Sequence, residues 1–432
     1  MKIARTFFLI VVWANTSIIP LLAQWVQTNE PYRGKILCLA VSDTNLFAGT
    51  DGEGVFRSTD NGNSWTAAST GLTNTPVQAL AVLDTKLFAG THDGIFLSTN
   101  NGSSWILTGT ALTGLMYTSV RAFAVSPNRT DSADILAGTG GGGVFLSTNN
   151  GISWAPAGLT HVNVRSLAVS FNGTGDTILF AGTNGSGAFR SIDNGKSWIS
   201  ASSGLTYAGV LSLAVSPNGI GGTNLIAGTW GGIFISTNNG TSWTEASTGL
   251  TFTYVYCLAI SYNGTGGTNL FAGTWNGVFL SVDNGINWTA VNTGLTNTDV
   301  FSLVVSGNNL FAGTDGGVWR CPLSEITSVG RLSIGLPKHF NLRQNYPNPF
   351  NPSTTISFEL PSKSFVSLKI FDGLGREVAA LISEELYAGN YAHKWNAESL
   401  PSGIYFYRMF AKQISGDRNY SYIETKKLIL MK

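Results

Sequence analysis

One octapeptide motif occurs six times in this sequence and constrains the fold more than any other feature. In each copy an Asn-Gly pair takes positive φ at little cost, and the Asp or Asn before it can hydrogen-bond the backbone two residues on. The motif therefore predicts a hairpin tip whose second strand begins at a Trp, and its repetition predicts a repeat fold. The copies are STDNGNSW, STNNGSSW, STNNGISW, SIDNGKSW, STNNGTSW and SVDNGINW, beginning at Ser58, Ser98, Ser147, Ser191, Ser236 and Ser281.

Four short segments recur around each octapeptide. In the second copy they are residues 77–82, 87–91, 94–98 and 104–108, all apolar or alternating runs separated by Gly, Asn and Asp. Such runs predict one four-stranded antiparallel meander per repeat. The Ala-Gly-Thr of the second segment occurs seven times, at intervals of 41, 48, 44, 46, 45 and 40 residues. These intervals match one blade per repeat of a β-propeller.

The seventh repeat lacks an octapeptide and stops at Pro322 without a fourth strand. Residues 24–28, which begin Gln-Trp, look like the missing Trp-led strand. Pairing of the first and last strands would leave no open seam. We therefore predict an all-β chain with a seven-bladed β-propeller over residues 24–323, closed by a strand that contains Trp25.

The octapeptides resemble the Asp-box, or BNR, repeat of sialidases, sortilin-like receptors, xyloglucan-cleaving propellers and photosystem-assembly-factor-like proteins. The resemblance implies that each box lies between the third and fourth strands of a blade, away from the catalytic face. It also implies a structural role for the third residue of each box, namely Asp60, Asn100, Asn149, Asp193, Asn238 and Asp283.

The N-terminus has the order of a secretory signal peptide. Lys2 and Arg5 precede an apolar run, and the small residue Ala23 marks the expected cleavage point. We therefore predict a signal peptide over residues 1–23 and an exported mature protein. No later run is long and apolar enough to span a bilayer. The net charge of +1 provides no electrostatic footprint for nucleic acid or acidic lipid.

After a predicted linker, residues 324–340, the sequence predicts a small antiparallel β-sandwich over residues 341–432. Prolines at 347, 349, 352 and 361 exclude a helix there. This region resembles the type A C-terminal sorting domain of the type IX secretion system, in QNYPNPFNPST, SLKIFDGLGREV, WNAESLPSGIYFYR and TKKLILMK. The resemblance implies the type IX machinery as partner, and delivery to the medium or the outer-membrane surface of a diderm bacterium. The rival interpretation is that the sandwich itself binds a ligand.

Ligand-binding candidates lie in the loops that differ between repeats. Trp230 and Trp275 each follow an Ala-Gly-Thr, so they could form a platform for sugar rings or peptide side chains, or could simply fill gaps between blades. Tyr207 and Tyr254 lie in blade-to-blade loops. Arg121 and Arg165 open the first strands of adjacent blades, where they could reach the axis of the propeller.

The sequence gives weaker evidence for catalysis than for ligand binding. A sialidase needs an arginine triad, and two candidate arginines do not provide one. A glycosidase needs two facing carboxylates, for which the loop candidates are Asp51, Asp93, Asp299 and Asp315. Because His92 and His161 lack a second ligand at metal spacing, we expect no metal, and we expect no cofactor.

Three functional hypotheses follow. We favour an exported, non-catalytic propeller that binds an extracellular glycan or protein. The alternative is a glycoside hydrolase, sialidase-like or xyloglucanase-like, and the third is a structural spacer at the cell surface.

Overall fold

The computed structural model of the protein describes residues 24–29, 34–73, 76–108, 119–127, 133–171, 177–217, 223–251, 253–262, 268–327, 339–362, 364–386, 389–413 and 421–432. The predicted signal peptide, residues 1–23, lies outside these ranges, as do residues 328–338 of the predicted linker. Among the described residues, no helix has the length and apolar character needed to cross a membrane.

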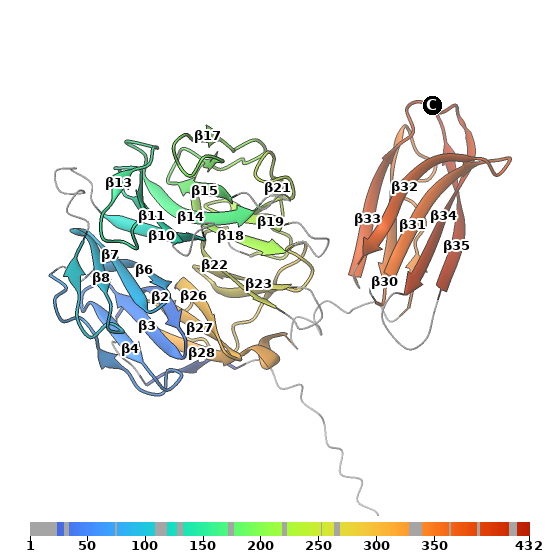
Figure 1. Cartoon of the computed structure of the whole chain (residues 1–432). Helices are drawn as coiled ribbons and strands as arrows, with labels where there is room; N and C mark the ends of the chain where they lie inside the picture. Colours follow the sequence, from blue (N-terminus) through green and yellow to red (C-terminus); the bar gives the residue numbers. More distant parts are fainter. Residues whose placement is uncertain are drawn as a thin grey trace, which may run out of the picture.

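Within these ranges, seven four-stranded antiparallel sheets follow one another along the chain, one for each repeat (Figure 1). Blades 1 to 3 comprise β2 (Ile36–Ser42), β3 (Asn45–Thr50), β4 (Val55–Ser58) and β5 (Thr66–Ala67); β6 (Val77–Leu83), β7 (Lys86–Thr91), β8 (Gly94–Ser98) and β9 (Ile106–Leu107); and β10 (Val120–Pro127), β11 (Ala133–Thr139), β12 (Val144–Ser147) and β13 (Ala155–Pro156).

Blades 4 to 6 have the same order. They comprise β14 (Val164–Phe171), β15 (Thr177–Thr183), β16 (Ala188–Ser191) and β17 (Ile199–Ser200); β18 (Val210–Pro217), β19 (Thr223–Thr229), β20 (Gly232–Ser236) and β21 (Thr244–Glu245); and β22 (Val255–Tyr262), β23 (Thr268–Thr274), β24 (Gly277–Ser281) and β25 (Thr289–Ala290).

Blade 7 is assembled from both ends of the propeller sequence. It contains β26 (Val300–Ser306), β27 (Asn309–Thr314) and β28 (Gly317–Pro322), and β1 (Val26–Gln27) pairs antiparallel with β28 as its fourth strand. The first strands of the blades contact one another in cyclic order, including β26 with β2, so they form the innermost ring. The predicted seven-bladed propeller is confirmed.

The recurring Ala-Gly-Thr permits close packing between blades. A Cβ atom added at Gly49 would lie 2.9 Å from Cγ1 of Val77 in the next blade, and one added at Gly313 would lie 2.7 Å from Cγ2 of Ile36 across the seam. Real Cβ atoms do not approach so closely. Glycine at this point therefore lets each blade's second strand pack against the first residue of the following blade.

Each octapeptide forms the same turn between the third and fourth strands. In blade 1, the hydroxyl of Ser58 donates to Oδ1 of Asp60 (2.8 Å) and accepts the amide of Gly62 (2.8 Å). Oδ1 of Asp60 also accepts the amide of Ser64 (2.8 Å). Asn61 and Gly62 have φ of 61° and 82°, which the Asn-Gly pair tolerates. In blade 2 the side chain of Asn100 takes the place of Asp60. Its Oδ1 accepts a hydrogen bond from the backbone N–H of Ser104 (2.9 Å).

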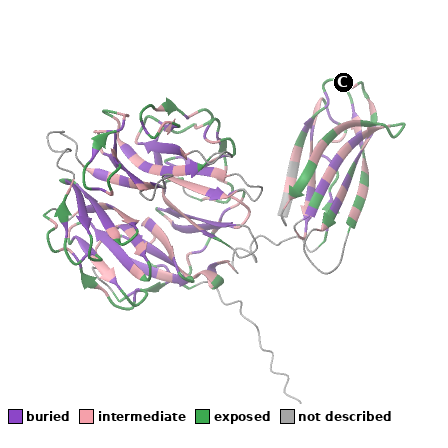
Figure 2. Cartoon of the chain, viewed as in Figure 1, coloured by how far each residue is buried: buried purple, intermediate pink, exposed green. Residues whose placement is uncertain are grey.

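The C-terminal region is an antiparallel β-sandwich, as predicted. One sheet contains β29 (Asn341–Leu342), β30 (Ser353–Leu360) and β33 (Gly389–Asn396), and the other contains β32 (Glu377–Leu386), β31 (Ser364–Asp372), β34 (Gly403–Gln413) and β35 (Ser421–Leu430). Buried residues alternate along β30, β31 and β34 (Figure 2). Phe358 of the first sheet and Leu368 and Met409 of the second belong to one buried apolar cluster.

A single helical turn follows the propeller at residues 323–327, at the start of the predicted linker. Ile326 in this turn is fully buried and belongs to the apolar cluster that contains Trp25 and Trp319. The chain therefore stays packed against blade 7 for several residues after its last strand.

Candidate functional site

The strand order divides the propeller into two faces. Each first strand begins, and each second strand ends, at one end of the blade, which we call the top face. Because the strands are antiparallel, the boxes between third and fourth strands lie at the opposite end, which we call the box face. Asp60, Asn100, Asn149, Asp193, Asn238 and Asp283 all lie in box turns, whereas the predicted ligand-binding residues lie at the top face.

At the top face, the residue before each first strand lies opposite the residue that follows Ala-Gly-Thr. The amide of Asn184 donates to the carbonyl of Asn163 (2.9 Å) in blade 4, and the amide of Trp230 donates to that of Gly209 (3.2 Å) in blade 5. The seven pairs, from blade 1 to blade 7, are Lys35–Asp51, Pro76–His92, Ser119–Gly140, Asn163–Asn184, Gly209–Trp230, Tyr254–Trp275 and Asp299–Asp315.

A β-bulge repeats at the second residue of every first strand, where the pairing with the second strand skips one position. Such a bulge re-aims the extra side chain. The charge of Tyr256 in blade 6 acts on the pKa of Arg165 in blade 4 although blade 5 lies between them, as expected if both side chains point toward the propeller axis. We call these seven residues the axial ring: Leu37, Gln78, Arg121, Arg165, Leu211, Tyr256 and Phe301.

Blades 5 and 6 present four exposed aromatic side chains on the top face. Trp230 is 39% exposed, Trp275 57%, Tyr207 46% and Tyr254 44%. Tyr254 and Trp275 make an edge-to-face contact with ring centroids 6.3 Å apart. Tyr207 covers Gly231, where an added Cβ would lie 1.9 Å from its ring, and Trp230 covers Gly209 in the same way. Tyr207 and Trp230 therefore rest on backbone, and all four residues, which we call the aromatic cluster, have much of their surface in solvent.

Blades 3 and 4 contribute a pair of arginines, which we call the basic pair. Arg121 and Arg165 are partly buried, and the ion pairs found among the described residues involve neither of them. Nε of Arg121 lies against Gly140, 3.1 Å from where a Cβ would be. Burial lowers the pKa of Arg165, and the nearby positive charge of Arg121 lowers it further. Two guanidinium groups thus share one partly desolvated region.

Blade 7 places two carboxylates side by side, which we call the acidic pair. Burial raises the pKa of Asp299 above its usual range, and the charge of Asp315 raises it further, while Lys35 opposes both effects. Lys35 Nζ lies 4.0 Å from the ring centroid of Phe301, and Tyr256 packs against the same ring at 5.5 Å. Lys35, Phe301 and Tyr256 therefore form one line of contacts beside the acidic pair.

The other predicted residues are dispersed. Asp51 and Asp93 are exposed in blades 1 and 2. No group of three His, Cys, Asp or Glu side chains in the described ranges is arranged to hold a metal ion. Three other arginines share one third-strand position and donate to box carbonyls of the next blade, namely Arg57 to Asn101 (3.1 Å), Arg190 to Asn239 (3.2 Å) and Arg320 to Asn61 (2.8 Å).

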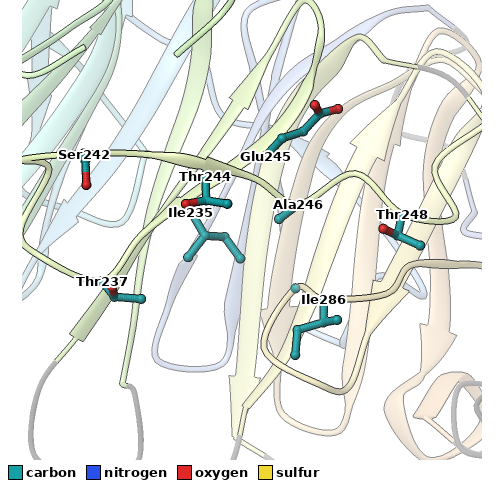
Figure 3. Close-up of a pocket in the computed structure, with 9 residues that line it drawn as sticks. Ile235, Thr237, Ser242, Thr244, Glu245, Ala246, Thr248 and Ile286 are labelled. Carbon is teal, nitrogen blue, oxygen red and sulfur yellow. The ribbon is translucent and has the colours of Figure 1, made fainter. Parts of the chain in front are cut away.

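A pocket of about 310 Å³ lies on the box face between blades 5 and 6 (Figure 3). Ile235, Thr237 and Thr244 of blade 5 line it together with Ile286 of blade 6. Ile235 occupies the strand position that holds Arg57, Arg190 and Arg320 in other blades, so no arginine spans this groove. Glu245 is the sole titratable group in its lining. The pocket is a gap between neighbouring boxes and brings no reactive groups together.

Sequence reasoning missed several top-face residues. Tyr256 and Phe301 share the strand position of Arg121 and Arg165, and alignment of the seven first strands at that position would have found them. No sequence motif marks Ser119, Asn163 or Asn184. Only the structure places their side chains near the basic pair.

The fold thus defines a seven-bladed β-propeller with box turns, followed by a β-sandwich. Residues 344–422 match the family described as the secretion system C-terminal sorting domain. The domain marks proteins exported by type IX secretion, so this protein is destined for the cell surface or the extracellular space, as predicted. No curated protein matches the sequence of the chain.

Three solved structures illustrate the likeness in fold. PorZ, a surface component of the type IX secretion system of Porphyromonas gingivalis, is 16% identical with a TM-score of 0.52 over 92% of this chain and 60% of that chain. YCF48 bound to D1 peptide is 15% identical, with a TM-score of 0.53 over 69% and 96%. The GH74 xyloglucanase of Xanthomonas campestris is 15% identical, with a TM-score of 0.50 over 78% and 59%. At these identities the likeness concerns the fold alone.

Proposed function

We propose that this protein is an exported, non-catalytic propeller that binds an extracellular glycan or protein ligand on its top face. The observation that carries the proposal is the aromatic cluster, in which Trp230 and Trp275 expose large ring surfaces. Aromatic faces stack on sugar rings and on peptide side chains, and burying such a surface on binding is favourable. Most large apolar side chains of the propeller are packed between blades, so these indoles stand out.

The similar structures are consistent with ligand binding by such a fold. YCF48 has been solved bound to a peptide, and the Xanthomonas campestris protein is described as a GH74 xyloglucanase. A propeller fold is therefore compatible with either ligand class, and the ligand of this chain has to be found by experiment.

Glycan and peptide arrays probed with the full-length protein test the proposal. The variant Trp230→Ala, Trp275→Ala should lose binding to any ligand that the wild type retains. A matched control is Ile152→Ala, Ile192→Ala, which removes two exposed apolar side chains from the box face. Binding that survives loss of both indoles would overturn the aromatic platform. Absence of any ligand for the wild type would favour the structural spacer.

Delivery of the protein rests on two segments. The sorting domain implies interaction with the type IX machinery, and we assign inner-membrane export to the signal peptide at residues 1–23. A periplasmic reporter fused to residues 330–432 should reach the surface of a strain that has the system. Retention of the fusion in the periplasm would contradict the view that residues 341–432 are a sufficient sorting signal.

A glycoside hydrolase is the second candidate, and the acidic pair is the observation that favours it. The raised pKa of Asp299 suits a general acid, and the side chain of Asp315 lies beside it as the second carboxyl group. Both come from neighbouring strand ends of blade 7, whereas glycosidases place two carboxylates on either side of the scissile bond. Hydrolysis of xyloglucan or sialylated glycans by the wild type, abolished in Asp299→Asn, would replace the binding proposal.

A further inference from the structure

Four buried polar atoms without a hydrogen-bond partner gather around the basic pair. They are Oγ of Ser119, Nε of Arg121, Oδ1 of Asn163 and Oδ1 of Asn184, all from the top face of blades 3 and 4. Buried polar groups in folded proteins are nearly always paired, because an unpaired one loses its bonds to water without replacement. Nine further unpartnered atoms in the described residues lie elsewhere in the chain, but these four lie beside two like-charged guanidinium groups, and that combination points to a ligand from outside the chain.

The chemistry of these atoms defines what that partner must offer. Nε of Arg121 needs an acceptor, and the second positive charge, on Arg165, makes an anion the favoured partner. A carboxylate accepts two parallel bonds from the planar fork of an arginine. Oδ1 of Asn163 and Oδ1 of Asn184 need donors, which a carboxylate cannot provide but a neighbouring hydroxyl can. One small group that carries both an acid and hydroxyls satisfies the whole set.

We propose that Arg121 and Arg165 form a carboxylate-binding subsite for an acidic sugar of the uronic acid type, whose hydroxyl groups donate to Asn163 and Asn184. This inference rests on the proposed function and specifies the ligand class for the same face. The guanidinium groups fix the carboxylate, and the amide oxygens fix the orientation of the ring. The mutual repulsion of the two arginines is relieved when the anion enters.

The surroundings of the basic pair are arranged for a chain of sugars. The aromatic cluster occupies blades 5 and 6, immediately beyond blade 4, so a neighbouring sugar could stack on Trp230 or Trp275. The acidic pair of blade 7 lies across the seven-membered ring from blades 3 and 4. Its negative charge disfavours a carboxylate on that side and therefore favours a single direction for an acidic ligand.

Calorimetric titration of the full-length protein with trigalacturonate, compared with its fully methyl-esterified form, tests the subsite. The wild type should bind the acid at least about 10-fold more tightly than the ester. Arg121→Gln and Arg165→Gln should each weaken binding of the acid about 10- to 100-fold, because a charge-assisted pair is lost. Arg165→Lys keeps the charge but not the fork, so it should bind with intermediate affinity. Lys196→Gln, which removes one positive charge from the box face, should bind as the wild type does.

The outcomes separate the two proposals. The subsite would be overturned if the wild type bound acid and ester equally and both arginine variants bound as the wild type does. If binding were also lost in the Trp230→Ala, Trp275→Ala variant, the aromatic platform would remain supported. Failure of the wild type to bind trigalacturonate at all would also overturn the subsite. The assignment to a glycan would be overturned if a peptide with a free C-terminal carboxylate bound more tightly than the uronate and lost that binding on substitution of Arg121. Melting temperatures equal to that of the wild type exclude misfolding of the variants.

Discussion

The indole Nε1 of Trp25 donates a 2.6 Å hydrogen bond to the carbonyl oxygen of Val291, which joins residues 266 positions apart in the sequence. Four of the six box tryptophans make the same bond to the preceding blade, for example Trp105 to Ala68 and Trp243 to Ala201, both at 2.7 Å. Trp25 therefore supplies to blade 7 what the octapeptide supplies to the others. Because β1 contributes only two paired residues, we expect the buried indole to hold the seam together with the backbone bonds.

Replacement of Trp25 by alanine should destabilise the seam. Trp25 is 2% exposed, and truncation of a buried tryptophan costs about 3–5 kcal/mol of unfolding free energy. Val26→Ala, in the same strand but at a residue that is 54% exposed, should change it by about 0.5 kcal/mol or less. Denaturant unfolding of both variants checks this prediction, and equal loss in the two would show that the strand, not the indole, closes the ring.

Arg320 should stabilise the seam in a second way. Its Nη1 donates to the carbonyl of Asn61 (2.8 Å) in blade 1, whereas Arg57 makes the matching bond from blade 1 to Asn101 (3.1 Å) in blade 2. Leucine occupies this strand position in blades 2, 3 and 6, so Arg320→Leu fits sterically. We expect a loss of about 0.5–1.5 kcal/mol.

Hydrogen exchange distinguishes the seam from the other blade boundaries. Amides of residues 25–28 should exchange faster in Arg320→Leu than in the wild type, and should be unchanged in Arg57→Leu. Faster exchange of these amides in both variants would mean that the arginines stabilise the propeller as a whole.

Two boxes should make stability depend on pH in acid. The hydroxyl of Ser64 donates to Asp60 and lowers the pKa of that carboxyl from 3.8 to about 2, and Ser197 does the same for Asp193. Since the folded pKa lies below the unfolded one, the stabilisation is present above about pH 4 and is lost as the pH falls toward 2.

The boxes that contain asparagine in place of aspartate show which substitution preserves the turn. Nδ2 of Asn100 donates to the hydroxyl of Ser104 (2.8 Å), so an amide builds the same turn without a titrating group. The double variant Asp60→Asn, Asp193→Asn should therefore lose less stability than the wild type between pH 4 and pH 2, as followed by thermal melts. Identical acid profiles for the two proteins would show that the box carboxylates do not contribute to the pH dependence.

The fold was predictable because its signals are local and repeated. The Asn-Gly turn of each box and the Ala-Gly-Thr of each second strand recur at blade length, and Trp25 identifies the closing strand. The top face was not predictable in the same way. Whether Arg165 meets Tyr256 depends on a bulge in each first strand and on the cyclic order of the blades, neither of which leaves a motif in the sequence. The ligand-binding roles of Trp230 and Trp275 remain predictions.

The sorting domain offers a test at Tyr407, which is fully buried in the sandwich. Its hydroxyl donates to the carbonyl of Arg343 (2.7 Å) and accepts the amide of Asn345 (2.9 Å), so it fixes the segment before β30. Tyr407→Phe leaves both backbone groups unpaired, which should cost about 1–3 kcal/mol. Burial raises the pKa of Tyr407 from 10 to about 12, so its contribution in the wild type should be complete below about pH 10 and should be lost as the pH rises toward 12. Hydrogen exchange of the Asn345 amide checks the prediction: exchange should accelerate in Tyr407→Phe, and unchanged protection would contradict the role of the hydroxyl.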